Sequence, residues 1–329
     1  MKAFRYERYG SPDVLELREV EKPAVTDDGV LVRVHASSVN PVDWHTLTGD
    51  PYLVRLHAGL LEPKTGILGV DFAGTVEAVG GNVQRLRPGD EVFGGRTGAF
   101  AEYVCVPEDR GVVSKPAGLT SEEAAALPVA AISALQALRD KGGVQSGQRV
   151  LVNGASGGVG TFAVQIAKAL GAEVTGVCST RNVELVQSIG ADHVVDYTQE
   201  DFTLRRERYH LMLDIAGNRS WSDCRRVLDE RATVVLVGGP KTNRWIGPLG
   251  HVAWLRLVTL RGSRKAIPFL ATITRDSLEG LVELVQAGNV TPLIDRRYDF
   301  GALPEALRYL GAGHAQGKVV VSHLENALG

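Results

Sequence analysis

Apolar and polar residues alternate in short runs over roughly the first 117 residues of the chain. A period of two is typical of strands that bury one face. Such runs cover residues 30–35, 74–79 and 101–106. Between them, Asn40-Pro41 and Gly80-Gly81 favour reversal of the chain. The pattern predicts a small, partly open β-barrel, followed by a helix that Thr120 or Ser121 caps.

After Gln148 the pattern changes to continuous apolar runs separated by helical segments. Such runs are typical of parallel strands that helices cover on both faces. The expected strands cover residues 149–152, 173–177, 193–196, 211–215 and 233–237, and the expected helices cover residues 161–170 and 183–189. Beyond Pro268 the order becomes helix 277–287, strand 293–298, helix 303–310 and strand 318–321. The sequence therefore predicts an α/β fold with a doubly wound parallel sheet.

A glycine-rich segment joins the first of these strands to the first of these helices. Its spacing, Gly154-x-x-Gly157-x-x-Gly160, is a variant of the dinucleotide-binding fingerprint, with Ala155 at the position of a further glycine. The glycines permit a sharp turn, close approach of a pyrophosphate to the backbone, and packing of helix on sheet. Because the segment follows a strand and opens a helix, cofactor binding is favoured over a plain structural turn. We expect the cofactor to contact Ser156, Gly157, Gly158, Val159 and Gly160.

The end of the second parallel strand indicates which dinucleotide binds. An NAD site carries an acidic residue there, about 20 residues after the fingerprint, which holds the ribose 2′-hydroxyl. Residues 176–182 contain no acid. The hydroxyls of Ser179 and Thr180 and the guanidinium of Arg181 instead suit a 2′-phosphate. The sequence therefore favours NADP(H), and the alternative is a solvated Arg181 at the start of a helix.

Composition and charge narrow the class of protein. The 36 basic and 38 acidic residues leave a net charge of −2, which does not favour a nucleic acid as partner, because phosphates require a concentrated basic face. The three cysteines are widely spaced, and the charged N-terminus lacks the apolar segment of a signal peptide. The longest apolar run falls short of the roughly 20 residues that span a bilayer. We expect a cytoplasmic protein of two domains with no membrane span.

Further motifs carry a resemblance to a known family. They cover residues 38–43, 69–80, 87–93, 98–104 and 317–321, in addition to the glycine fingerprint. With them the chain resembles the medium-chain dehydrogenase/reductase superfamily, specifically its zinc-free quinone oxidoreductase-like branch, and residues 40–44 are similar to its reticulon-4-interacting-protein-like members. The resemblance implies a GroES-like β-barrel catalytic domain, a Rossmann domain, a substrate cleft between them, and a homodimer. It divides the chain into residues 1–122 (catalytic), 123–267 (Rossmann, NADP(H)-binding) and 268–329 (return to the catalytic domain).

The resemblance to this superfamily also argues against a zinc site in this chain. Zinc-dependent relatives supply a cysteine where this chain has Asn40 and a histidine where it has Val70. Residues 127–132 contain no cysteine, histidine or glutamate that could serve as a third ligand. Because a catalytic zinc needs about three protein ligands, we expect no metal.

Without a Lewis acid, we expect NADPH-dependent reduction of quinones or α,β-unsaturated carbonyl compounds, in which the developing charge spreads to the carbonyl oxygen. Tyr52 is the candidate proton donor, with a plain cleft-lining aromatic as its alternative, and His45 is a further candidate. Asn40 is a candidate for holding the nicotinamide ribose or polarising the carbonyl, with an Asn-Pro turn as its alternative. The resemblance implies further cofactor contacts at Ser133, Tyr197 and Lys318, and Gly238-Gly239 is an expected point of close approach to the nicotinamide half.

Two other functions stay open on the sequence alone. One is reduction of another activated alkene, such as an enoyl thioester or a biosynthetic intermediate. The other is a sensor or interaction protein that binds NADPH and turns over little. Cofactor motifs do not separate these functions, because binding alone satisfies them.

Overall fold

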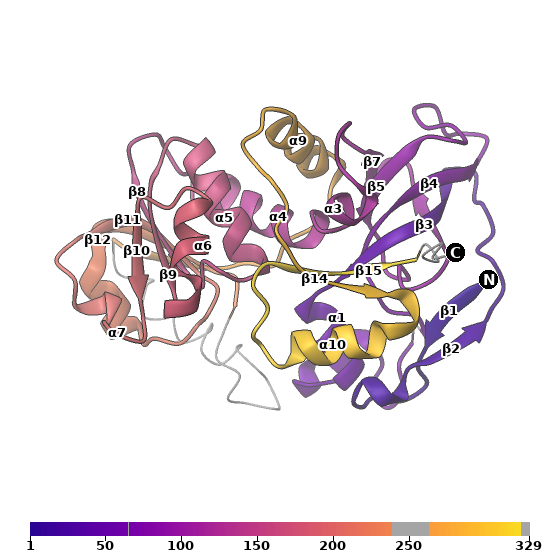
Figure 1. Ribbon diagram of the computed structural model, residues 1–329, viewed down its shortest axis with the longest axis horizontal. Coiled ribbons are helices and arrows are strands. Elements are labelled where there is room, and N and C mark those ends of the chain that lie inside the picture. The colour runs from indigo at the N-terminus through magenta and orange to yellow at the C-terminus, as the bar shows by residue number, and fades with distance from the viewer. Residues whose placement is uncertain (65, 239–262, 324–329) are drawn as a thin grey trace. The chain divides into compact units, whose positions relative to one another are not determined.

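Two compact units make up the chain in the computed structural model, which describes residues 1–64, 66–238 and 263–323 (Figure 1). The first unit comprises Met1–Ile132, Ile273–Gln286 and Pro292–Gly329. The second unit comprises Ser133–Thr272 and Ala287–Thr291. The second unit is therefore an insertion, and the chain returns to the first unit at its C-terminal part.

A seven-stranded, mostly antiparallel sheet forms the first unit. Its longest strand, β3 (Gly29–Val39), pairs with β4 (Asp71–Val79) on one side and with β15 (Lys318–Ser322) on the other. Val319 lies opposite Val39, so the C-terminal strand completes a sheet built by the N-terminal part. The other strands are β5 (Glu91–Gly95), β6 (Tyr103–Pro107), β7 (Val112–Ser114), β14 (Ile294–Asp299) and the separate pair β1 (Lys2–Arg5) and β2 (Glu16–Glu19).

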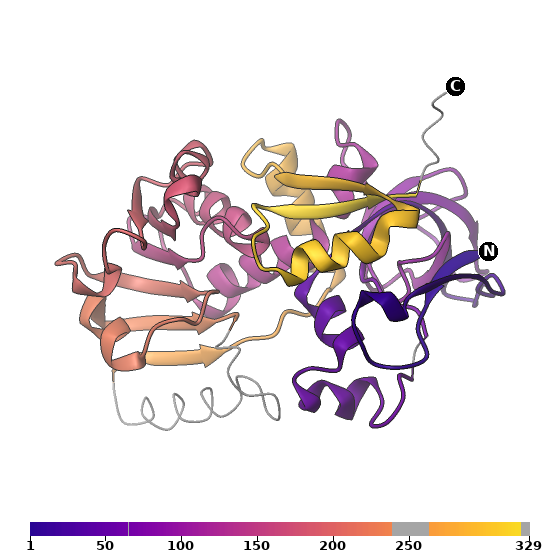
Figure 2. The same ribbon diagram turned by 60° about the horizontal axis from the view of Figure 1, so that its bottom comes forward.

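Short helices cover this sheet. Amphipathic α10 (Leu303–Gly311) buries its apolar face and lies beside β14 and β15 (Figure 2). The shorter α3 (Ser121–Ala125) begins with a capping box, in which the Thr120 hydroxyl accepts the N–H of Glu123 at 3.2 Å and the Glu123 carboxylate accepts the N–H of Thr120 at 2.8 Å. Thr120 is therefore the cap of this helix. The other helices outside the parallel sheet are α1 (Pro41–Thr48), α2 (Arg55–Ala58), α4 (Pro128–Leu135) and α9 (Arg275–Gln286).

Helix α1 overturns one expectation. Asn40 is its N-cap and Pro41 is its first residue, so the Asn-Pro pair opens a helix and does not reverse the chain as the sequence pattern indicated. Proline suits this position because its fixed φ is helical and the N–H that it lacks has no partner inside the helix. The helix ends at Gly49, whose φ of 59° is one that glycine adopts without strain.

A six-stranded parallel sheet forms the second unit, in the order β10-β9-β8-β11-β12-β13. Counted along the chain this order is 3-2-1-4-5-6, which is that of dinucleotide-binding sheets and confirms the predicted Rossmann fold. Figure 2 shows the salmon and orange strands of this sheet side by side, with their arrowheads in one direction. The strands are β8 (Arg149–Asn153), β9 (Glu173–Cys178), β10 (His193–Asp196), β11 (Tyr209–Asp214), β12 (Leu228–Leu236) and β13 (Lys265–Pro268), and the helices are α5 (Gly158–Ala169), α6 (Val183–Ser188) and α7 (Trp221–Cys224).

Helix α5 packs on β8 and β9. Residues 160–167 are all buried, so this part of the helix is covered on every side and not along one face only. Gly160 in its first turn lets the helix lie close to the glycine-rich loop. The packing thus fixes the position of the glycine-rich loop that precedes the helix.

Candidate functional site

The glycine-rich loop lies at the carboxyl end of β8, directly before α5. Gly154 has a φ of +98°, which favours glycine. A Cβ added at Gly160 would lie 2.1 Å from the carbonyl oxygen of Gly154, so a side chain there would force the helix away from the turn. Gly157 is the N-cap, and no side chain in the described part of the chain caps the helix. The first N–H groups of α5 are therefore placed to bind an anion, as the fingerprint predicts.

The segment after β9 carries Ser179, Thr180 and Arg181 to the same end of the sheet as this loop. Thr180 Oγ1 donates a hydrogen bond to Asp196 Oδ2 at 2.6 Å. The backbone N–H and the hydroxyl of Thr198 donate to Asp196 Oδ1 at 2.9 and 2.7 Å. These bonds, that of Thr180 first, hold the pKa of Asp196 below its ordinary value, and the carboxylate is ionised. The hydroxyl hydrogen of Thr180 is therefore already engaged.

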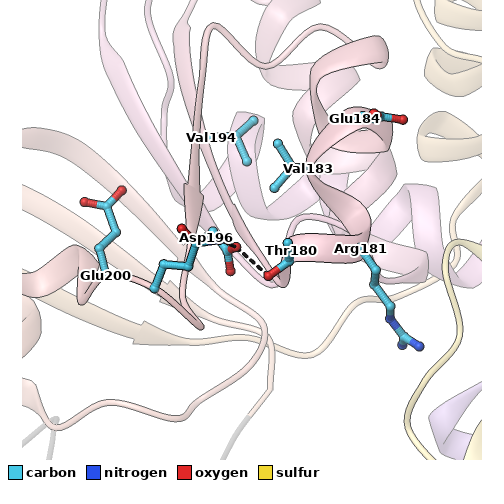
Figure 3. Close-up of a pocket in the computed structure, with 8 residues that line it drawn as sticks. Thr180, Arg181, Val183, Glu184, Val194, Asp196 and Glu200 are labelled. Carbon is cyan, nitrogen blue, oxygen red and sulfur yellow. Dashed lines mark hydrogen bonds between the residues drawn. The ribbon is translucent and has the colours of Figure 1, made fainter.

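A pocket of about 830 Å³ lies beside Thr180 (Figure 3). Arg181 lines it together with the acidic residues Glu184, Asp196 and Glu200, whose carboxylates would repel a phosphate. Figure 3 shows the side chain of Arg181 extending away from Asp196 and Glu200. A phosphate held by Arg181 would therefore lie on the side of the pocket that this guanidinium faces, away from Asp196 and Glu200.

Asn182 belongs to this site although the sequence pattern did not indicate it. Its side chain is buried, with 5% of the residue exposed. Its Nδ2 lies 2.9 Å from Ser156 Oγ and 3.2 Å from Ser179 Oγ, and donates to both. It therefore joins the glycine-rich loop to the end of β9. Asparagine is a common N-cap residue before a helix, so the sequence carries no indication that Asn182 contacts the two serines.

The remaining residues that the sequence analysis expects to contact the cofactor lie on several different elements. Tyr197 follows β10 and is 48% exposed. Gly238 is required by packing, since a Cβ there would lie 1.9 Å from the carbonyl oxygen of Ile215. Ser133 lies in α4 and is buried. Gly239 lies outside the described residues.

A buried polar cluster occupies the start of β4 and the end of β3 in the first unit. The Lys318 ammonium, from β15, donates to Asn40 Oδ1 at 2.6 Å and lies 3.4 Å from Asp71 Oδ2. The same carboxylate oxygen accepts from Asn40 Nδ2 at 2.8 Å and from the Ser38 hydroxyl at 2.6 Å. Asp71 Oδ1 accepts the N–H of Val129 at 2.9 Å. With 4% of the Lys318 side chain and none of Asp71 exposed, each of these charges is compensated mainly by the other.

This cluster fixes the orientation of the Asn40 amide. Its oxygen faces Lys318 and its nitrogen faces Asp71, and 2% of the residue is exposed. Rotation of the amide would place its NH₂ group against the ammonium and its oxygen against the carboxylate. The contacts of Asn40 and Lys318 with a cofactor, which the sequence analysis expects, stay predictions.

Asp43 lies next to the cluster and is itself buried. Its carboxylate accepts the N–H of Asn40 at 2.8 Å and that of Gly69. Burial raises the pKa of Asp43 to about 7, the backbone N–H groups oppose the rise, and the neighbouring charge of Asp71 adds to it. The residue therefore gains or loses its proton near neutral pH.

Tyr52, the candidate proton donor, lies in a short 3₁₀ helix between α1 and α2. The guanidinium of Arg55 lies 4.8 Å from the centre of the Tyr52 ring and 4.4 Å from that of Tyr9, which is a cation–π arrangement. Arg55 is held there by a hydrogen bond of 3.0 Å from Nε to the carbonyl of Gly49. Nδ1 of His45, the other candidate, is 2.7 Å from a backbone carbonyl.

Comparison with known proteins relates both units to proteins of established classes. Residues 26–117 match the family model described as the alcohol dehydrogenase GroES-like domain, and residues 189–321 match that of the zinc-binding dehydrogenases. The chain is 34% identical to a 2-methylene-furan-3-one reductase of Solanum lycopersicum, over 98% of this chain and 79% of that protein. It is 33% identical to the mitochondrial NAD(P)H oxidoreductase RTN4IP1 of Mus musculus, over 98% and 89%. The structure of a quinone oxidoreductase from Coxiella burnetii matches it with a TM-score of 0.86 and 30% identity, over 98% and 99%.

One of these family descriptions implies a zinc ion, and the residues present do not fit it. Asn40 and Val70 stand at two of the expected ligand positions, and neither is a ligand that zinc prefers. The Lys318 ammonium is bonded to the Asn40 oxygen and would repel a cation there. Within the described ranges, no group of three histidine, cysteine, aspartate or glutamate residues is arranged to hold a metal.

The raised pKa of Asp43 predicts a pH dependence of stability. The folded state keeps the proton up to about pH 7, whereas the unfolded chain releases it near the ordinary value of 3.8. Its contribution to stability is therefore complete below about pH 4 and is lost as the pH rises towards 7. Compared with Asp43→Asn, the native chain should lose several kcal/mol of unfolding free energy over this interval, measured by urea denaturation at successive pH values.

The exposed variant Asp27→Asn is the matched control, and it should follow the pH dependence of the native chain. Parallel pH curves for the native chain and Asp43→Asn would show that Asp43 titrates as an ordinary carboxyl group.

Proposed function

The chain belongs to the medium-chain dehydrogenase/reductase family, as its sequence motifs predicted, and on this premise we propose that it reduces quinones or α,β-unsaturated carbonyl compounds with NADPH and without zinc. It is an oxidoreductase that uses a nicotinamide cofactor, like the relatives named above. One observation carries the zinc-free part of the proposal. The position at which zinc-dependent relatives have a cysteine ligand holds an amide that is bonded to a buried ammonium.

The preference for NADP(H) over NAD(H) rests on the groups beside the glycine-rich loop. Residues 179–182, which directly follow β9, contain no carboxylate, whereas an NAD site has one at the end of this strand to hold the ribose 2′-hydroxyl. Asp196 lies on the neighbouring strand, at the end of β10, and its carboxylate accepts hydrogen bonds from the hydroxyls of Thr180 and Thr198. Ser179 and Arg181 supply a hydroxyl and a guanidinium, which suit a phosphate.

The proposed reaction needs little from the protein beyond orientation and charge stabilisation. Bound NADPH supplies a hydride, and a conjugated acceptor takes it at the β-carbon. The negative charge that results spreads to the carbonyl oxygen, so a hydrogen-bond donor serves where other dehydrogenases use a Lewis acid. We assign the donor role to the phenol of Tyr52, with Arg55 beside its ring to stabilise a developing phenolate.

Two further expectations concern the oligomeric state of the protein and its location in the cell. A homodimer is expected from the resemblance alone, and a cytoplasmic location is expected from the few, widely spaced cysteines, while one relative is a mitochondrial protein. In the part of the chain that the structure describes, no helix combines the length and the apolarity that crossing a bilayer requires. Both expectations stay predictions.

The activity itself is tested by NADPH consumption. We expect steady oxidation of NADPH with 1,2-naphthoquinone, 9,10-phenanthrenequinone and a panel of enals, followed by absorbance at the nicotinamide band. Tight binding of NADPH with no oxidation by any acceptor would instead identify a binding protein.

Replacement of Arg181 tests the assignment of the cofactor. Arg181→Ala should raise the KM for NADPH by about 10- to 100-fold, because a charge-assisted hydrogen bond is worth roughly 1.5–3 kcal/mol, and should leave the KM for NADH unchanged. The exposed variant Arg206→Ala controls for loss of a positive charge on the same unit. Equal changes for both nucleotides would remove Arg181 from the 2′-phosphate site.

Replacement of Tyr52 tests the proton donor. Tyr52→Phe keeps the ring that Arg55 stacks on and removes the hydroxyl, so kcat for an enal should fall about 100-fold, the lower range for loss of a general acid. Tyr103→Phe, whose ring also lies under a cation, is the matched control and should leave kcat unchanged. An unchanged rate for Tyr52→Phe would reduce the residue to a packing role.

A further inference from the structure

The amide of Asn182 stands between two serine hydroxyls that come from different loops. Ser156 belongs to the glycine-rich loop after β8, and Ser179 follows β9. Both hydroxyl oxygens accept from the one Nδ2 atom, at 2.9 and 3.2 Å. Since this NH₂ group has two hydrogens, it can supply one to each serine.

The direction of these hydrogen bonds decides what each serine offers to a ligand. A hydroxyl carries one hydrogen, and when its oxygen accepts from a neighbour that hydrogen is left to donate elsewhere. Ser156 and Ser179 accept from Asn182 and are both partly exposed, so each presents an O–H donor at the surface. Thr180 is the opposite case, because its hydrogen goes to Asp196.

The carbonyl oxygen of the Asn182 side chain is in an environment that is unusual for a purely structural residue. Within the described residues, its Oδ1 is buried and has no hydrogen-bond partner. A buried carbonyl without a partner is unfavourable, and such groups in native proteins call for an explanation beyond stability.

The charges nearby indicate which ligand the two hydroxyls suit. Arg181 lies between Ser179 and Asn182 in the chain, and its side chain extends away from the carboxylates of Asp196 and Glu200 (Figure 3). Two O–H donors that share one nitrogen atom, one of them two residues before Arg181 in the chain, favour a multiply charged anion over a neutral ribose hydroxyl.

We propose that Asn182 is a positioning residue, which orients the hydroxyls of Ser156 and Ser179 as a pair of donors to the 2′-phosphate of NADP(H). The glycine-rich loop then contributes to the choice between the two nucleotides through Ser156, in addition to binding the pyrophosphate. The inference rests on the proposed NADPH-dependent function and deepens it, because it assigns part of the selectivity for NADP(H) to an amide that acts through the two serines.

Binding of nucleotide fragments tests this without any reaction. Adenosine 2′,5′-bisphosphate carries the 2′-phosphate, and 5′-AMP lacks it. By isothermal titration calorimetry on the full chain, Asn182→Ala should weaken binding of the bisphosphate about tenfold, since two oriented hydrogen bonds are lost, and should change binding of 5′-AMP less than twofold. Asn182→Asp should weaken the bisphosphate further, because its carboxylate takes up both serine hydrogens and adds a negative charge.

A double-mutant cycle separates positioning from a merely structural role. In the Ser156→Ala/Ser179→Ala background, Asn182→Ala should cause no further loss of bisphosphate affinity, because the groups that it orients are gone. Asn82→Ala is the matched control, since it removes an exposed side-chain amide that is hydrogen-bonded to Asp28, and it should bind both fragments like the native chain.

The outcomes are distinct. Equal losses for both fragments, or full additivity in the cycle, overturn the positioning role while native NADPH binding still supports the proposed function. A native chain that binds neither fragment nor NADPH overturns the proposed function itself, and the inference with it.

Discussion

The pairing of the buried Lys318 ammonium with Asp71 and Asn40 is the constraint on which the first unit depends. Lys318 comes from the last strand, Asp71 from the start of β4, and Asn40 from the junction of β3 and α1. A charge removed from water must be compensated nearby, so these three elements are held at fixed positions relative to one another. The same interaction joins the last strand of the sheet to residues of the N-terminal part of the chain and forms a polar cluster in the interior of the unit.

This interaction also shapes the chemistry that the unit can support. An ammonium has no vacant orbital to accept a substrate oxygen as a metal ion does, and the hydrogen bonds of this one are directed to an amide oxygen and towards a carboxylate. Stabilisation of the developing negative charge then falls to hydrogen-bond donors, for which conjugated acceptors are the most suitable substrates. The N–H of Val129 donates a hydrogen bond to the Asp71 carboxylate. This bond fixes the start of α4, the helix that carries Ser133.

Secondary structure and the glycine-rich turn could be predicted from the sequence, because they depend on local residue patterns. Contacts between side chains that lie far apart in the chain could not be predicted. The parallel strands and the glycine-rich turn were predicted because hydrophobic periodicity and glycine spacing are local properties. Helix α1 was missed because Asn40-Pro41 is equally typical of a turn and of a helix start. Asp71 and Lys318 lie 247 positions apart in the chain, and an aspartate at a strand end gives no sign of such a distant partner.

In the nucleotide site, the sequence predicted which residues are present but not the direction of their hydrogen bonds. The sequence placed three hydroxyl or guanidinium residues at the end of β9, and the structure separates them by hydrogen-bond direction: Thr180 donates to Asp196, whereas Ser179 accepts from Asn182. Residue type alone does not determine whether a hydroxyl is a donor or an acceptor towards a ligand, because that depends on its other partners.

The central claim is that a fixed ammonium and an amide stand where a metal would otherwise act. Metal analysis of the purified protein by mass spectrometry, combined with NADPH-dependent turnover before and after dialysis against a strong chelator, tests it most directly. The account predicts far less than one zinc per chain and unchanged turnover. One tightly held zinc per chain, whose removal abolishes activity and whose return restores it, would contradict it.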